Sequence, residues 1–187
     1  MSNIAIIIPS RLKAERLPNK PLKLINKKEM ILHVYEAAKN SNVGKVIVAT
    51  PDQEILNLIK KNNGLSVLTS DMHETGTDRV FEVFKKELNS NSEIIINYQG
   101  DMPNLKPQAI RNLAEHMKKN LCDIGTLAAR IESEHEEKDS NVVKVLVEND
   151  IKNKSFAKAL DFFRISSKPL NKLVFHHVGI MPLLTKL

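Results

Sequence analysis

The chain has 187 residues, of which 42% are hydrophobic and 27% are charged. This composition is typical of a globular protein with one sizeable core. Its single cysteine, Cys122, excludes an internal disulfide and a cysteine-based zinc site, and it fits a reducing compartment. No run approaches the roughly 20 apolar residues of a membrane span, and the first residues lack the pattern of a secretory signal. We therefore expect one cytoplasmic domain over residues 1–187 with no membrane span.

The net charge of +6 would by itself suit nucleic acid binding. Lysine pairs on expected helix exteriors account for part of it: Lys60-Lys61, Lys85-Lys86 and Lys118-Lys119. Only 4% of the residues are aromatic and none is tryptophan, so stacking platforms for bases are scarce. We therefore expect no nucleic acid partner.

Strand and helix patterns alternate up to about residue 130. Short apolar runs predict strands at 4–8, 45–49, 65–68, 93–97 and 122–128. Helical periodicity covers about 29–40, 53–62, 77–88 and 107–119, with Asp52 as a plausible N-cap. This order predicts an α/β fold with a Rossmann-like, mostly parallel sheet.

The rhythm changes after residue 130. Residues 132–139 read as a charged loop, and strand-like runs follow at 142–147, 157–163 and 175–180. These runs predict a mixed β extension. The chain stops soon after the last of them, so we expect a final strand without a cover.

A basic loop follows the first predicted strand. It carries Arg11, Arg16 and Lys20, and two prolines stiffen it. Ligands of parallel sheets lie outside the carboxyl ends of the strands, where three cations can neutralise a triphosphate. The loop lacks the G-x-x-x-x-G-K-[ST] pattern of a Walker P-loop.

A second loop, Asn97-Tyr-Gln-Gly-Asp101, follows the apolar run Ile94-Ile-Ile96. Asp101 can bind a hard cation such as Mg²⁺ together with substrate phosphates, or it can simply cap the turn. The amide of Gln99 both donates and accepts hydrogen bonds, which suits a pyrimidine edge.

The segment Thr75-Gly-Thr-Asp-Arg79 precedes a helical pattern. Thr77 could be the N-cap, with Val80, Phe81 and Phe84 facing the core. The segment is then either a plain helix start or a place where Arg79 faces a nucleotide.

Polar residues after residue 130 give weaker signals. Lys144 interrupts an apolar strand, so it faces either solvent or a cleft. His176 and His177 are adjacent and would point to opposite faces of a strand, so they cannot chelate a metal together. No Ser-His-Asp set follows from the spacing, and a reaction that depends on positioning and metal electrostatics needs no protein nucleophile.

Five segments together resemble the 3-deoxy-manno-octulosonate cytidylyltransferase family. They are IIIPSRLKAERLPNKPL, VIVATPDQEI, TGTDRVFE, INYQGDMP and NVVKV, and the resemblance runs from about Ile4 to Ile180. It implies a nucleotidyltransferase of the nucleotide-diphospho-sugar transferase type. Such an enzyme transfers CMP from CTP to 3-deoxy-D-manno-octulosonate (Kdo) and releases pyrophosphate, with Mg²⁺ as cofactor, for lipopolysaccharide biosynthesis.

The resemblance also implies site residues. Arg11 and Lys20 match triphosphate-binding positions, and Asp101 matches a metal-ligand position, so these three are the expected catalytic residues. The other expected substrate-binding residues are Arg16 of the first loop, Arg79 and Gln99 at nucleotide-recognition positions, and Lys144, Arg164 and His177 facing the sugar acid or phosphates.

The sequence departs from the family in three places. Phe163 stands where the family usually has serine, and Met181 stands where it has tyrosine. The family also extends by roughly a further quarter of its length, with a second metal-binding aspartate, sugar-acid contacts and part of its homodimer surface. The tail after residue 180 does not resemble the family, which a shift of reading frame near that codon would explain. We therefore expect little synthetase activity from residues 1–187.

Three alternatives to this enzyme remain at the level of sequence. One is a cytidylyltransferase for another sugar acid such as a sialic acid, which TGTDR and GDMP disfavour. Another is a catalytically dead nucleotide-binding or dimerisation module. The last is a fragment without a stable fold.

Overall fold

The computed structural model describes residues 3–13, 17–88, 91–120, 122–151, 156–165 and 172–185. The chain forms two compact units. Unit 1 comprises Met1–Gly125 and Ile180–Leu187, and unit 2 comprises Thr126–Gly179. The expectation of a single domain over 1–187 stays a prediction beside this division.

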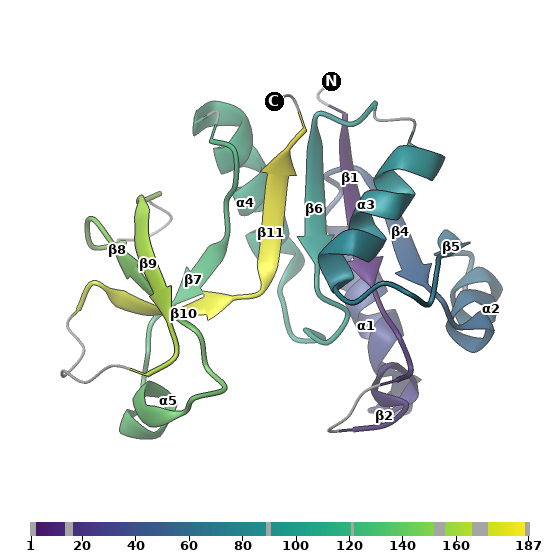
Figure 1. The fold of residues 1–187 in the computed structure, drawn as a ribbon, viewed down its shortest axis with the longest axis horizontal. Coiled ribbons are helices and arrows are strands. Elements are labelled where there is room, and N and C mark those ends of the chain that lie inside the picture. The colour runs from purple at the N-terminus through teal and green to yellow at the C-terminus, as the bar shows by residue number, and fades with distance from the viewer. Residues whose placement is uncertain are drawn as a thin grey trace. The chain divides into compact units, whose positions relative to one another are not determined.

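Unit 1 is built on a five-stranded sheet of order β11-β6-β1-β4-β5 (Figure 1). Its strands are β1 (Ile4–Pro9), β4 (Lys45–Thr50), β5 (Ser66–Leu68), β6 (Ile94–Tyr98) and β11 (Ile180–Leu184). All neighbours pair in parallel except β11, which runs antiparallel to β6. The predicted Rossmann-like sheet of mostly parallel strands is confirmed.

The helices of unit 1 are α1 (Met30–Asn40), α2 (Gln53–Lys61), α3 (Gly76–Glu87) and α4 (Pro107–Asn120). A short 3₁₀ turn η1 (Lys20–Leu22) and a hairpin of β2 (Leu24–Ile25) and β3 (Lys28–Glu29) precede α1. All four predicted helices are confirmed to within one residue at each end. None of the helices within the described residues is long and apolar enough to cross a membrane.

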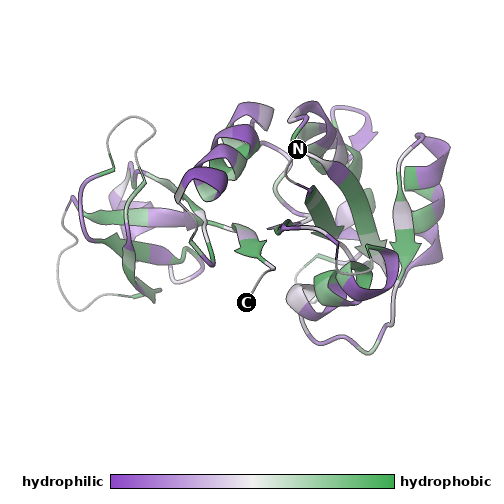
Figure 2. Cartoon of the chain, turned by 90° about the horizontal axis from the view of Figure 1, so that it is seen from above, coloured by the Kyte–Doolittle hydropathy of each residue, from purple (hydrophilic) through white to green (hydrophobic). Residues whose placement is uncertain are grey.

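The two faces of β1 bury alternate residues. Ala5 and Ile7 pack with Val80 and Val83 of α3 in one core cluster, and strand alternation turns Ile4, Ile6 and Ile8 to the other face. Figure 1 shows α3 in front of the sheet and α1 and α4 behind it. Figure 2 shows the strands of the unit 1 sheet mostly in green and the helices in mixed purple and green, as expected for amphipathic helices on a buried sheet.

The start of α3 differs from the prediction. Thr75, not Thr77, is the N-cap, because its hydroxyl accepts a hydrogen bond from the amide of Asp78 while the Asp78 carboxylate accepts one from the Thr75 amide. Phe81 is 53% exposed, so its predicted place in the core is wrong, whereas Val80 is buried and Phe84 packs partly against the core.

The expectation that the last strand lacks a cover is also wrong. The run 175–180 mainly forms β10 (Val174–Val178), which pairs with a strand on each side, and the unpredicted strand β11 follows it. Strand β11 lies at the edge of the sheet and α4 packs against it. The outer side of β11 is hydrogen-bonded to the segment 123–125. The Gly125 amide donates to the Pro182 carbonyl, and the Leu184 amide donates to the Asp123 carbonyl. Proline is tolerated here because Pro182 turns its backbone away from β6.

Unit 2 contains a four-stranded antiparallel sheet of order β7-β10-β8-β9. The strands are β7 (Leu127–Ala129), β8 (Lys144–Val147), β9 (Ala159–Phe163) and β10 (Val174–Val178). The run at 122–128 therefore forms a strand only near its end. Residues 132–139 are not wholly a loop, because Ser133 caps the short helix α5 (Glu134–Lys138).

Candidate active site

A cavity of about 920 Å³ opens in unit 1 beside the carboxyl ends of β1 and β6. Four segments and Met30 line it: 9–13, 17–21, 71–79 and 99–101 contribute its wall residues. All four segments belong to or include the three loops that the sequence singled out: the basic loop with Arg11 and Lys20, Thr75–Arg79 and Asn97–Asp101. The strands of a parallel sheet place those loops together because their carboxyl ends meet at one edge.

The first loop brings Arg11 and Lys20 to this cavity. Arg16 lies outside the described residues. Asp52, which follows β4, binds this loop, because its Oδ2 accepts a hydrogen bond of 2.8 Å from the Leu12 amide. Asp52 does occupy the predicted N-cap position of α2, but its side chain makes no capping bond to that helix.

Lys20 and Asp101 meet in the cavity wall. Nζ of Lys20 lies 2.9 Å from Oδ2 of Asp101, and the two side chains are 37% and 53% exposed. The expected phosphate-binding cation and the expected metal ligand therefore neutralise each other in the free protein.

The loop after β6 approaches β1 so closely that only glycine fits at position 100. A Cβ on Gly100 would lie 2.8 Å from the carbonyl oxygen of Pro9. Beside it, Nε2 of Gln99 donates to Oδ1 of the fully buried Asn97 over 3.3 Å. This bond leaves Oε1 of Gln99 as an acceptor on the wall of the cavity.

Arg79 lines the cavity from α3 but is only 2% exposed. Its guanidinium donates to the hydroxyl of Thr69 and, over 2.8 Å, to the carbonyl oxygen of Ser70. Burial lowers the pKa of Arg79, and the nearby charge of Arg11 lowers it further. The structure therefore gives Arg79 a role in holding the loop that precedes α3.

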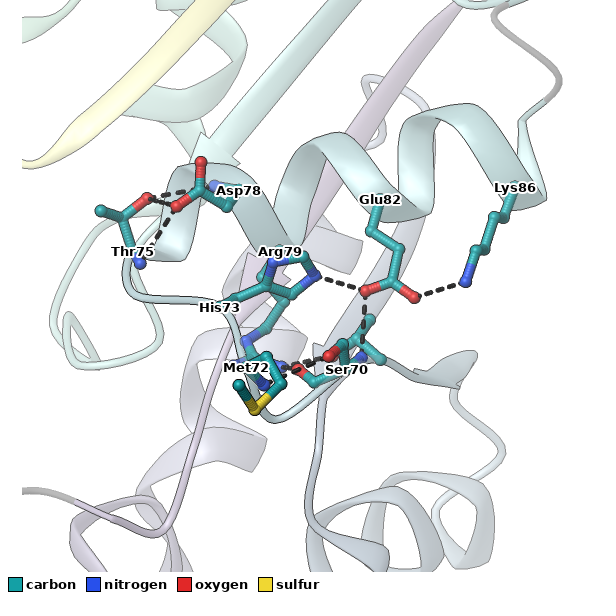
Figure 3. Close-up of polar contacts among 9 residues, drawn as sticks. Ser70, Met72, His73, Thr75, Asp78, Arg79, Glu82 and Lys86 are labelled. Carbon is teal, nitrogen blue, oxygen red and sulfur yellow. Dashed lines mark hydrogen bonds and ion pairs between the residues drawn. The ribbon is translucent and has the colours of Figure 1, made fainter.

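That loop carries polar residues that the sequence prediction missed. Asp71, His73 and Thr75 line the cavity, as does Lys13 of the first loop. Figure 3 shows Glu82 of α3 between His73, Ser70 and Lys86. A run of polar residues between a strand and a helix was the available signal, but it does not tell which of them face a cavity.

Burial opposes the ionisation of Glu82, but its hydrogen bonds outweigh that effect and lower the pKa of Glu82 to about 2. The carboxylate is therefore charged at neutral pH and only accepts hydrogen bonds. It follows that Nε2 of His73, which lies 2.5 Å from Oε2 of Glu82, carries the hydrogen of that contact.

The three predicted site residues of unit 2 lie together around β8. Lys144 is only 1% exposed, so the option that it faces solvent is wrong, and its Nζ donates to the carbonyl oxygens of Asp139 and Arg164. Arg164 in turn donates to two backbone carbonyls of the loop 140–141. The half-buried ring of His177 makes an edge contact with Phe162 at a centroid distance of 5.2 Å, and burial lowers the pKa of His177.

The donor set at the cavity suits a hard cation held partly by its substrate. Asp101 presents a half-exposed carboxylate, and Mg²⁺ is commonly held by one or two carboxylates together with phosphate oxygens. No group of three or more His, Cys, Asp or Glu side chains within the described ranges could hold a metal by itself.

A parallel α/β sheet with a cationic cavity outside its strand ends is the architecture of a nucleotide-binding enzyme. The family model described as Cytidylyltransferase matches residues 5–183, which places the chain among the nucleotidyltransferases. The 3-deoxy-manno-octulosonate cytidylyltransferase of Histophilus somni is 36% identical over 95% of this chain and 74% of its own length. The enzyme of that name from Thermodesulfovibrio yellowstonii is 38% identical over 93% of this chain and 72% of its own.

Among solved structures, that of CMP:2-keto-3-deoxy-manno-octonic acid synthetase complexed with CTP superposes with a TM-score of 0.85 at 33% identity. The match covers 98% of this chain and 75% of the synthetase. A 4-diphosphocytidyl-2C-methyl-D-erythritol synthase from Anaerococcus prevotii, 14% identical with a TM-score of 0.63, shares the fold. The chain belongs to the 3-deoxy-manno-octulosonate cytidylyltransferase family.

Proposed function

We propose that the chain transfers CMP from CTP to 3-deoxy-manno-octulosonate (Kdo), giving CMP-Kdo and pyrophosphate. The observation that carries the proposal is the cavity in which Arg11, Lys20, Gln99 and Asp101 stand together, in a chain 33% identical to a synthetase complexed with CTP. The product would serve lipopolysaccharide biosynthesis.

The cationic residues of the first loop would bind the triphosphate. Arg11 offers forked donors and Lys20 a point charge, and Lys13 adds a third cation at the cavity wall. Arg16, which is not among the residues that the structure describes, completes the proposed set. Their charges would stabilise the pyrophosphate as it leaves, which is where negative charge develops.

The base of the nucleotide would lie near Gln99. Its amide is fixed by Asn97, which is itself bonded to Thr77 over 3.4 Å. A fixed amide can select a pyrimidine edge, whereas a freely rotating one would match several bases. Arg79 would contribute by holding the loop before α3 against the cavity.

The acceptor would attack the α-phosphate through its anomeric hydroxyl oxygen. A new P–O bond forms there as the hydroxyl gives up its proton to solvent, and the bond from the α-phosphorus to the bridging oxygen breaks so that pyrophosphate leaves. We propose that Arg164 and His177 bind the sugar acid and that Lys144, whose ammonium group is occupied by backbone carbonyls, supports Arg164.

Asp101 would hold Mg²⁺, which when bound supplies charge neutralisation at the phosphates. The released Lys20 would then be free to contact phosphate oxygens. The homodimer implied by the family resemblance and the cytoplasmic location expected from the composition stay predictions.

The test is calorimetric titration with CTP and Mg²⁺, followed by an assay of pyrophosphate release with CTP and Kdo. We expect CTP to bind and pyrophosphate release to require both substrates. A chain that melts cooperatively but does not bind CTP contradicts the proposal. CTP binding without pyrophosphate release would favour the nucleotide-binding module over the enzyme and would fit the low activity expected from the sequence.

A further inference from the structure

Helix α3 holds the loop of residues 69–75 at three places along its length. Arg79 bonds to Thr69 and Ser70 at the start of the loop. Glu82 bonds to the start of the loop at Ser70 and to its middle at His73, and the capping box of Asp78 and Thr75 fixes its end. Since this loop forms one wall of the cavity, the helix determines where that wall stands.

The two oxygens of Glu82 have different partners (Figure 3). Oε2 accepts from the Ser70 amide at 3.0 Å and from Nε2 of His73 at 2.5 Å. Oε1 accepts from Nζ of Lys86, one helical turn away, at 2.8 Å. One oxygen therefore accepts hydrogen bonds from the loop, and the other accepts one from a side chain on the surface of α3 itself.

Glu82 is well placed for this role because it is largely shielded from water. Its side chain is 12% exposed, whereas that of Lys86 is 69% exposed. Hydrogen bonds to a charged acceptor in such a setting are stronger than neutral ones. Among the residues tied to Glu82, His73 also lines the cavity, so the contact reaches the ligand site through a single side chain.

We propose that Glu82 is a positioning residue for nucleotide binding: through Ser70 and His73 it fixes the cavity wall before a nucleoside triphosphate arrives. The inference rests on the proposed function, since it takes the ligand of the cavity to be CTP. A wall that is already ordered loses less conformational entropy when the ligand binds. Without Glu82 the loop would become ordered only when CTP binds, and the entropy lost in that step would lower the affinity for CTP.

The experiment compares three variants by calorimetric titration with CTP and Mg²⁺ and by thermal melting. Glu82→Ala removes both loop contacts and is expected to raise the Kd for CTP about tenfold, a change within the range that charge-assisted hydrogen bonds contribute. Glu82→Gln keeps a carbonyl oxygen that can take the place of Oε2, so it should restore most of the affinity. Lys86→Ala is the matched control, because it removes only the partner of Oε1 and should leave the Kd unchanged.

The conservative variant separates positioning from plain stability. A merely structural Glu82 would lower the melting temperature of Glu82→Ala and leave the Kd of the folded fraction unchanged, which would overturn the inference. Equal weakening by Glu82→Gln and Glu82→Ala would also overturn it, since the charge and not the loop contact would then matter.

Glu82→Asp serves if Glu82→Ala does not melt cooperatively. It keeps the charge and the helix surface but withdraws the carboxylate by one methylene, so the Kd should again rise. An unchanged Kd in that variant contradicts the inference while the proposed function stands. A wild-type chain that does not bind CTP would contradict both the inference and the proposed function.

Discussion

Nζ of Lys20 lies 2.9 Å from Oδ2 of Asp101, although the two residues are 81 positions apart in the sequence. The contact exists because β1 and β6 are parallel neighbours, so the loops that leave their carboxyl ends meet. Both groups would change partners when CTP and a cation bind: Lys20 would turn to phosphate oxygens and Asp101 to the cation. The pair therefore keeps one cation and one anion in the cavity wall before any ligand binds.

Lys20→Ala should reduce the rise in melting temperature that millimolar CTP with Mg²⁺ produces. The substitution removes a phosphate-binding cation, and ligand binding to the native state stabilises it by mass action. Lys61→Ala is the control, because Lys61 is exposed at the end of α2 and lies away from the cavity. Differential scanning fluorimetry measures both, and an equal CTP shift in the two variants would contradict the role of Lys20.

Asp101→Asn should weaken the Mg²⁺-dependent part of CTP binding while stability barely changes. Asparagine keeps a turn-capping oxygen but loses the negative charge that a hard cation requires. The half-exposed ion pair with Lys20 contributes at most about 1 kcal/mol to stability.

Titration of CTP with and without Mg²⁺, together with a urea melt, distinguishes the metal ligand from the turn cap. Asp101 would be a turn cap if Asp101→Asn lost stability and kept its Mg²⁺-dependent CTP binding. That outcome would leave the cation to be held by other groups.

The sequence predicted much of the candidate site because its chemistry lies at strand ends. Continuous apolar runs marked β1 and β6 as buried strands, and Arg11 and Asp101, which stand two and three positions after the strand ends, do line one cavity. Thr75 was a detectable cap, since an aspartate stands three residues later, but Thr77 fits the same local pattern apart from that partner.

The missed features depend on contacts between distant residues. The burial of Lys144 is invisible in the sequence because its partners are backbone carbonyls 5 and 20 positions away, which carry no side-chain signature. The bond between His73 and Glu82 depends on how the loop before α3 folds back, which local periodicity does not encode. Phe81 was misplaced because a helix of 12 residues buries only one stripe, and Val80 and Val83 occupy it.

Lys144→Met should lower the free energy of unfolding by about 1–3 kcal/mol. Methionine fills a similar volume but leaves the carbonyl oxygens of Asp139 and Arg164 without their donor. Lys138→Met is the control, because Lys138 is 74% exposed and pairs with Glu134 of its own short helix.

Urea melts of both variants measure this difference. The control should change by less than about 0.5 kcal/mol, as expected for an exposed pair one helical turn apart. If Lys144→Met were as stable as the wild type, the ammonium group would have no structural role, and a direct role toward the substrate would regain weight.

The low pKa of Glu82 predicts a pH dependence of stability that can be assigned to one residue. The pKa falls from its ordinary value of 4.5 to about 2 in the folded chain, so folding favours the ionised carboxylate. Its contribution is therefore complete above about pH 4.5 and is lost as the pH falls toward 2. Other carboxylates, such as Asp78, have lowered pKa values too, so only the difference between wild type and Glu82→Gln isolates this group.

In urea melts, the stability advantage of the wild type over Glu82→Gln should shrink between pH 5 and pH 3. An advantage that stays constant over that range would mean that the pKa of Glu82 is not lowered and that its bonds to Ser70 and His73 do not favour the charged form.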